Sequence, residues 1–237
     1  MEVSAITATR VQGKRQRQVL AETGFSLRAG ETIAVVGASG SGKTTLAEIM
    51  LGLRTPTTGQ VRVLGNTWNS PTRGPSAHLR KLVQGVPQDP AASFVPTWSI
   101  RRSITLAINR LQALSNLSAV SSSDDLIEQA AQLAHFDLGL LNRRPAQLSG
   151  GQAQRAAIAR ALAVRPSIVV ADEPTSALDH ATANSVANEL LTVSAKAGLG
   201  LLLVTHDPDL AQRCTRQIAL SPPSQTSSFN TAEYGNH

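Results

Sequence analysis

The sequence has little cysteine and few aromatic residues. Its 237 residues include one cysteine, Cys214, and only 3% of them are aromatic. A single thiol excludes an internal disulfide framework and a cysteine-rich metal site. The scarcity of aromatic rings argues against a protein that binds single-stranded nucleic acid by base stacking.

Long apolar runs are also absent. The longest candidates, such as residues 200–204, have the length of a strand, whereas a helix that crosses a bilayer needs about 20 apolar residues. The first residues, Met1 to Ser4, lack a basic segment followed by an apolar one, so no secretory signal is visible. We therefore expect a cytoplasmic chain that does not span a membrane.

Positive charge exceeds negative charge. Lys and Arg number 22 and Asp and Glu number 16, which gives a formal net charge of +6, and such a surplus is typical of proteins that bind nucleic acid or anionic lipid. The clearest basic run, Lys14 to Arg17, suits such a patch or a solvated hairpin turn, and we favour the turn. With 41% hydrophobic residues, the length suits one domain that can contain an inserted subdomain.

Apolar runs and helical periodicities alternate along the chain. Three apolar, β-rich runs predict buried parallel strands, and each has a helical pattern beside it. The expected strands cover residues 32–36, 167–171 and 201–205, and the expected helices cover 43–53, 152–164 and 181–197. This alternation predicts an α/β fold whose sheet is mostly parallel.

Two other regions differ from this core. Short β-rich segments predict an antiparallel flank, at residues 6–10, 24–27 and 60–64. The middle of the chain has helical spacing instead, at residues 100–114 and 125–133. We therefore expect a helical subdomain over residues 91–145, inserted in a core of residues 1–90 and 146–220. The polar, Pro- and Ser-rich tail 221–237 is expected to be loosely ordered.

Residues 37–44 match the phosphate-loop pattern G-x-x-x-x-G-K-[ST], between an expected strand and an expected helix. The glycines let backbone N–H groups converge on phosphate oxygens, Lys43 adds a cation at the β- and γ-phosphates, and Thr44 offers a hydroxyl to Mg²⁺. A flexible Gly- and Ser-rich turn is the alternative, and the flanking elements argue against it. The predicted nucleotide-binding residues here are Gly37, Ala38, Ser39, Gly40, Ser41, Gly42, Lys43, Thr44 and Thr45.

Two acids directly follow the second core strand. Asp172 and Glu173 would lie at the carboxyl edge of a parallel sheet, where α/β proteins bind ligands. Beside a phosphate loop, Asp172 is expected to hold Mg²⁺ and Glu173 to accept the proton of the attacking water. An acidic loop without a catalytic role is the alternative.

The segment Leu148 to Gln152 has the sequence Leu-Ser-Gly-Gly-Gln and precedes an expected helix. Ser149 and the two glycines then lie at a helix amino terminus, which is a natural anion site. Taken alone, the segment is equally typical of an ordinary helix cap. With the phosphate loop before it and the acid pair after it, it resembles the signature sequence of the ABC transporter ATPases.

The resemblance extends to further segments. Residues 86–90 look like the family's Q-loop, 176–179 resemble its D-loop, and 205–207 resemble its switch-histidine loop. The resemblance implies that Gln88 approaches Mg²⁺ and the attacking water and that His206 senses the γ-phosphate. It implies Mg²⁺ and ATP as cofactors, with Mg²⁺ near Thr44, Gln88 and Asp172, and ATP contacts from Ser149, Gly150, Gly151, Gln152 and Asp179.

ATPases of this family work in head-to-tail pairs, in which the phosphate loop of one subunit and the signature segment of the other enclose one ATP. The resemblance therefore implies a second ATPase subunit, identical or homologous, and separate integral membrane permease subunits. It also implies an extracytoplasmic substrate-binding protein as an indirect partner, and a peripheral position on the cytoplasmic face of the membrane. Residues 88–98 would connect the nucleotide to the permease, and no nucleic-acid partner is expected.

Within the family, residues 88–96 are similar to a segment of the dipeptide, oligopeptide and nickel importer group, and residues 96–100 look closer to its nickel and metallophore members. This implies an importer of nickel, a metal chelate or a short peptide. The alternatives are a soluble ABC ATPase of another machine, such as one for phosphonate breakdown, and a non-hydrolysing regulatory module. The presence of Glu173, His206 and Gln88 argues against the regulatory module.

Two departures from the family pattern stand out. The family usually stacks an aromatic ring on adenine just before the first hairpin, whereas residues 8–11 offer none. Arg10 or Arg15 could stack a guanidinium group there instead, and we expect weak discrimination between adenine and guanine. The second departure is that residues 221–223 replace the usual acidic, Gly-containing hairpin.

Overall fold

Two β-sheets form the framework of the protein. The computed structural model describes residues 1–13, 15–113 and 122–223, so Lys14 and most of the predicted tail lie outside the described residues. The parallel sheet has the strand order β6-β7-β8-β3-β9, with β3 (Thr32–Val36), β6 (Val83–Val86), β7 (Ile168–Asp172), β8 (Gly200–Val204) and β9 (Arg216–Ala219). The antiparallel sheet has the order β2-β1-β4-β5, with β1 (Glu2–Gln12), β2 (Arg15–Ser26), β4 (Thr58–Val63) and β5 (Asn66–Asn69).

The central strands of the parallel sheet, β3, β7 and β8, are buried on both faces, since successive side chains of a strand point to opposite sides and both sides are covered. One apolar cluster joins one set of these side chains to α4 (Gly150–Leu162) and α5 (His180–Ala197). Its members from the sheet are Ala34, Val169, Ala171, Leu201 and Leu203. A second cluster joins the alternate set to α1 (Lys43–Met50) and the antiparallel sheet, and it contains Ile33, Val35, Val170, Leu202 and Val204. This two-sided burial explains why the central strands have continuous apolar sequences.

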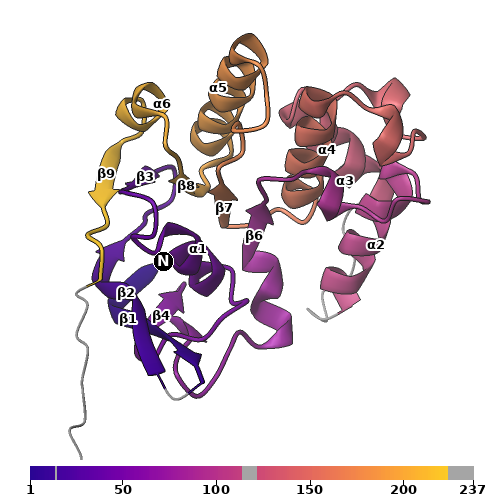
Figure 1. Cartoon of the computed structure of the whole chain (residues 1–237). Helices are drawn as coiled ribbons and strands as arrows, with labels where there is room; N and C mark the ends of the chain where they lie inside the picture. The colour runs from indigo at the N-terminus through magenta and orange to yellow at the C-terminus, as the bar shows by residue number, and fades with distance from the viewer. Residues whose placement is uncertain (14, 114–121, 224–237) are drawn as a thin grey trace, which may run out of the picture.

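Three helices follow strands of the parallel sheet. They are α1 (Lys43–Met50) after β3, α5 (His180–Ala197) after β7 and α6 (Pro208–Gln212) after β8. α1 lies against β7 and β8. α5 ends at Gly198, whose φ of 62° is a left-handed conformation that glycine adopts easily. Figure 1 shows α5 and α6 on one side of the sheet and α1 on the side of the antiparallel strands.

The middle of the chain contributes helices and short helical turns. These are η1 (Ala77–Leu82), η2 (Ala91–Ser93), α2 (Ile100–Ala113), α3 (Ser123–Leu133), η3 (Leu138–Leu140), η4 (Pro145–Gln147) and α4 (Gly150–Leu162). Ser122 begins α3 with a capping box, since its hydroxyl accepts a hydrogen bond from Asp125 N and the Asp125 carboxylate accepts one from Ser122 N. The α2–α4 group packs together beside the parallel sheet (Figure 1).

Several boundaries differ from the sequence-based expectations. β1 and β2 form a hairpin much longer than the segments 6–10 and 24–27 that we expected. α1 stops at Met50 rather than at residue 53, because Gly52 turns the chain with a φ of 68°. The expectation also missed three strands, β5, β6 and β9. β6 and β9 are the edges of the parallel sheet, where mixed and partly exposed sequences lack a long apolar run.

Among the described residues, no helix combines the length and the apolar character that crossing a bilayer requires.

Candidate active site

The phosphate loop connects the end of β3 to the start of α1. Gly37, Gly40 and Gly42 have φ values of 152°, 79° and 100°, which side chains with a Cβ rarely adopt. The Lys43 ammonium donates hydrogen bonds to Gly37 O at 2.8 Å and to Ala38 O at 3.1 Å. The loop therefore curls around its own lysine, with a cation held at the centre of its backbone groups.

The loop also fits closely against neighbouring chain segments. A Cβ on Gly42 would lie 2.4 Å from Val19 O, and one on Gly37 would lie 2.7 Å from Leu220 O. The Ser41 hydroxyl is buried without a hydrogen-bond partner among the described residues, and buried hydroxyls are normally paired. Bound phosphate oxygens and the N–H groups around them would provide such pairing, so the loop fits the nucleotide predicted for it.

Asp172 and Glu173 lie where β7 ends, at the carboxyl edge of the parallel sheet. Burial, followed by the charges of Glu173 and Glu48, raises the pKa of Asp172, and Lys43 acts in the opposite direction. Glu173 has a φ of 45°, which is rare for a residue with a side chain. Its Oε1 lies 2.9 Å from His206 Nε2, so the predicted base and the predicted γ-phosphate sensor are in contact.

A cleft of about 660 Å³ brings together the three residues predicted to lie near Mg²⁺, since Thr44, Gln88 and Asp172 all line it. No group of three or more His, Cys, Asp or Glu side chains in the described part of the chain could hold a metal ion. Mg²⁺ typically binds through one or two carboxylates together with water and substrate phosphates. The single carboxylate of Asp172 with the hydroxyl of Thr44 fits that mode of binding.

A smaller hollow, of about 280 Å³, is lined by Gly37 and His206 among others. Gly37 follows β3 and His206 follows β8, and these two strands are neighbours in parallel register. The phosphate loop, the acid pair and the histidine therefore meet at one edge of the sheet. The structure thus brings together Gly37, Lys43, Thr44, Gln88, Asp172, Glu173 and His206.

The signature segment lies apart from this group. Ser149 caps α4, because its hydroxyl accepts from Gln152 N at 3.3 Å while Gln152 Oε1 accepts from Ser149 N at 2.9 Å. Ser149 and Gly150 are exposed. No hydrogen bond or cleft wall among the described residues connects this segment to the phosphate loop, and so the chain presents two separate helix starts that can face anions.

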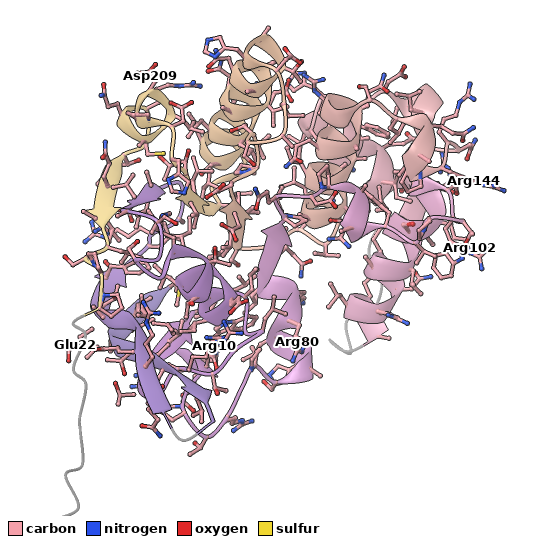
Figure 2. All side chains as sticks on the ribbon, viewed as in Figure 1. Arg10, Glu22, Arg80, Arg102, Arg144 and Asp209 are labelled. Carbon is pink, nitrogen blue, oxygen red and sulfur yellow. The ribbon has the colours of Figure 1, made fainter. Side chains whose placement is uncertain are left out.

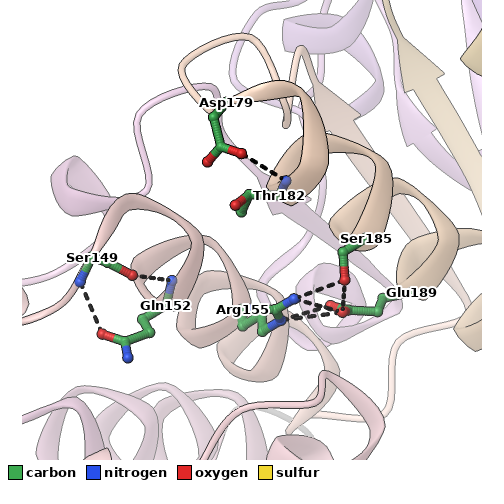
Figure 3. A network of polar contacts seen from close by, with 7 residues as sticks. All are labelled: Ser149, Gln152, Arg155, Asp179, Thr182, Ser185 and Glu189. Atoms are coloured by element: carbon green, nitrogen blue, oxygen red, sulfur yellow. Dashed lines mark hydrogen bonds and ion pairs between the residues drawn. The ribbon is translucent and has the colours of Figure 1, made fainter.

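α5 packs against the signature helix α4, and Arg155 of α4 is bonded to Ser185 and Glu189 of α5 (Figure 3). Asp179 Oδ1 accepts from Thr182 N at 3.0 Å, and hydrogen bonding by Thr182, first through its side chain and then through its main chain, lowers the pKa of Asp179. A Cβ on Gly151 would lie 2.5 Å from Thr182 Cγ2, so only glycine allows α4 and α5 to approach so closely. One helical turn further on, Arg155 makes a forked ion pair with Glu189, at 2.9 Å and 2.8 Å.

Sequence reasoning missed two features of this region. It did not identify the Arg155–Glu189 pair, which joins α4 to α5, or the role of Ser176 as the hydrogen-bond partner of Gln88 at 3.1 Å. Both contacts join residues that are far apart in sequence, 34 and 88 positions respectively. Only the amphipathic pattern of α4 and α5 could have indicated that the two helices pack against each other.

The fold and this arrangement define the class, which is a P-loop ATPase. A family model described as "ABC transporter" matches residues 20–176. The chain belongs to this family, as an ABC-type ATPase with the ATP-binding domain of a transporter.

Curated relatives and solved structures agree with this assignment. The chain is 36% identical over 222 residues to the uncharacterised ABC transporter ATP-binding protein YbbA of Escherichia coli K12, covering 93% of each chain. It is 36% identical to the lipoprotein-releasing system ATP-binding protein LolD of Xylella fastidiosa, covering 93% of this chain and 89% of LolD. It is 33% identical to a probable peptide ABC transporter ATP-binding protein of Sinorhizobium fredii, y4tS, and spans 55% of that protein's length.

A dimeric post-hydrolysis structure of the ATP-binding cassette MJ0796, bound to ADP and Pi, superposes with a TM-score of 0.79. It is 28% identical in sequence, and the match covers 93% of this chain and 94% of MJ0796.

Proposed function

We propose that this chain is the ATP-hydrolysing subunit of an ABC importer and that it uses Mg²⁺. The observation that carries the proposal is the convergence of Thr44, Gln88 and Asp172 on one cleft, with Glu173 in contact with His206 beside it. Lys43 and the N–H groups of the loop would bind the β- and γ-phosphates. Mg²⁺, when bound near Thr44 and Asp172, would supply neutralisation of phosphate charge.

Glu173 acts as the general base for the attacking water in this proposal. A base must lie within hydrogen-bond reach of the proton that it accepts, and Glu173 directly follows the cleft residue Asp172 at the end of β7. His206, 2.9 Å away, holds that carboxylate in place before nucleotide binds. Once ATP is bound, His206 Nε2 is available to donate a hydrogen bond to the γ-phosphate.

The test of this assignment is Glu173→Gln. The amide keeps the shape and the reach of the side chain but accepts protons poorly, so we expect nucleotide binding to persist and turnover to fall at least about a hundredfold. A closed, ATP-bound dimer should accumulate and be detected by size-exclusion chromatography with light scattering. Turnover within about threefold of the parent protein would show that Glu173 is not the base.

A dimer is the second part of the proposal. Ser149 and Gly150 are exposed and separate from the phosphate loop of their own chain, and they need the phosphate of a second subunit to complete an anion site. The MJ0796 neighbour is dimeric. A head-to-tail pair, homodimeric or heterodimeric, would place the signature segment of each subunit on the ATP of the other.

The same cleft also suits a permease. Residues 91–145 would act as a helical subdomain that moves against a core of residues 1–90 and 146–220. Leu53 lines the cleft and is 72% exposed, so its side chain is available to contact a docked permease segment. Gln88 lines the cleft together with Thr44 and Asp172, so a permease segment docked there would sense the state of the nucleotide. We place the chain on the cytoplasmic face of the membrane, as a peripheral subunit.

The positive charge suits this position. Figure 2 shows Arg10 on the antiparallel sheet and Arg102 and Arg144 on the α2–α4 group.

Arg10 and Arg17 lie directly opposite each other in the β1–β2 ladder, and both are exposed. Like charges in this arrangement repel, and a bound anion would relieve the repulsion. Arg10 or Arg15 would stack a guanidinium group on the base in place of the missing aromatic ring.

For the cargo we propose only a class, taken from the finer resemblance. Residues 88–100 support nickel, a metal chelate or a short peptide, with an extracytoplasmic binding protein as the indirect partner. The name of the y4tS relative favours peptide among these. The LolD relatives support a second candidate, a system that releases lipoproteins. Purifying the chain with its membrane partners and identifying them would decide, and its absence from the membrane fraction would favour a non-transport machine.

A further inference from the structure

Three hydrogen bonds connect the wall of the cleft to the main chain of Glu173, and all three involve Ser176. Gln88 Nε2 donates to Ser176 Oγ at 3.1 Å. The same hydroxyl donates to Glu173 O at 3.0 Å, and Ser176 N donates to that carbonyl at 3.2 Å. Since a hydroxyl has one proton and two lone pairs, it can donate to the carbonyl and accept from the amide at the same time.

Glu173 needs such support because its backbone is strained. Its φ of 45° lies in the left-handed region, which is unfavourable for a residue with a Cβ. The surrounding contacts hold it in place: Glu173 N donates to Val204 O at 3.0 Å, and Glu173 O accepts both bonds from Ser176. The direction of the Glu173 side chain depends on this backbone conformation, so the loss of one support would shift the carboxylate.

We propose that Ser176 is a positioning residue for ATP hydrolysis. Its hydroxyl ties the Gln88 side chain, on the cleft wall, to the strained main chain of Glu173. When an occupant of the cleft moves the Gln88 side chain, two hydrogen bonds transmit the movement to the main chain of Glu173. The direction of the Glu173 carboxylate then changes with its backbone. This inference rests on the proposed function only in taking Glu173 as the base; the mechanical link is independent of that role.

Hydrogen exchange tests the link without any turnover. In the nucleotide-free chain, Ser176→Ala should speed exchange of the peptide spanning residues 173–178 by roughly three- to tenfold, as expected for the loss of one hydrogen bond. Gln88→Ala should speed the same peptide at least about twofold, although it is 88 positions away in sequence. Unchanged exchange in Gln88→Ala would overturn the link, whatever the identity of the base.

Steady-state kinetics test whether ATP hydrolysis depends on the link through Ser176. We expect Ser176→Ala to lower kcat roughly three- to tenfold with less than about a twofold change in KM for ATP, and Ser176→Thr, which keeps the hydroxyl, to recover most of the loss. The control is Ser70→Ala, since the Ser70 hydroxyl also donates to a main-chain carbonyl but lies outside the site; its kcat should equal that of the parent.

A double-mutant cycle then distinguishes a link from two separate effects. In the Gln88→Ala background, Ser176→Ala should lower kcat by a clearly smaller factor than in the parent, because the shared hydrogen bond is already lost. The same factor in both backgrounds would show that Ser176 acts without Gln88 and would refute the proposal. If Gln88→Ala leaves too little turnover to measure, the exchange experiment decides.

Discussion

Gly42 allows a sharp test of how the phosphate loop is built, because two constraints act on it together. Its φ is 100°, and a Cβ would lie 2.4 Å from Val19 O and 3.1 Å from Leu20 Cδ1. Gly40, two positions earlier, has a φ of 79° and no atom within 4 Å of its would-be Cβ. Gly42→Ala therefore introduces backbone strain and a steric clash, whereas Gly40→Ala introduces strain alone.

The expected magnitudes follow from these geometries. A non-glycine residue in a left-handed conformation costs about 1–2 kcal/mol, which is our estimate for Gly40→Ala. The overlap with Val19 O, a main-chain atom of β2, adds about 1–3 kcal/mol, typical of forcing an extra methyl group into a packed site. We therefore expect Gly42→Ala to lower the free energy of unfolding by about 2–5 kcal/mol. It should also displace the loop from β2 and weaken nucleotide binding strongly.

Urea unfolding of the two variants and the parent, followed by circular dichroism, measures the difference. A lower midpoint at an unchanged slope reports a change in stability, and fluorescent nucleotide titration reports binding. Equal destabilisation by the two substitutions would refute the steric part of the reasoning. Tight nucleotide binding by Gly42→Ala would refute the claim that contact with β2 sets the shape of the loop.

Two further predictions concern charged side chains. Burial and the charges of Glu173 and Glu48 raise the pKa of Asp172 above its ordinary value of 3.8. The ionisation of Asp172 therefore destabilises the apo fold as the pH rises from 3.8 through the raised pKa. Asp172→Asn should therefore raise the melting temperature of the apo protein at pH 7.5, less so near pH 4, and abolish Mg²⁺-dependent hydrolysis; a lower melting temperature at pH 7.5 would contradict this. Arg155→Ala leaves the nearly buried Glu189 carboxylate without its cation, so we expect a loss of about 2 kcal/mol in the free energy of unfolding. Arg155→Lys should recover part of it, because a lysine cannot reproduce the forked pair, and an unchanged urea midpoint for Arg155→Ala would show that the pair is not structural.

The central strands were predictable from the sequence because nearly every residue in them is buried. β3, β7 and β8 are covered on both faces, so they require continuous apolar sequences, and the expected positions agree with the structure to within one residue. The antiparallel hairpin was only partly predicted. One face of β1 and β2 is exposed and carries polar residues such as Arg10 and Arg17. These residues interrupt the apolar sequence, so the full length of the two strands has no continuous apolar run.

The sequence by itself determined the local chemistry of the site. The pattern of residues 37–44 predicts a glycine-containing turn, and the apolar run before Asp172 and Glu173 predicts that these acids follow a buried strand. Both predictions use only residues that are neighbours in the chain. It also indicated which family the chain belongs to, through the order of its motifs.

Tertiary structure decided which of these groups meet. Parallel pairing of β7 with β8 places Glu173 against His206, and pairing of β6 with β7 places Gln88 near Ser176. Each pair comes from different loops at the same sheet edge, and strand order is set by the packing of the whole core rather than by any local pattern. For the same reason, the left-handed backbone of Glu173 and the contact of Gly42 with β2 became visible only in three dimensions.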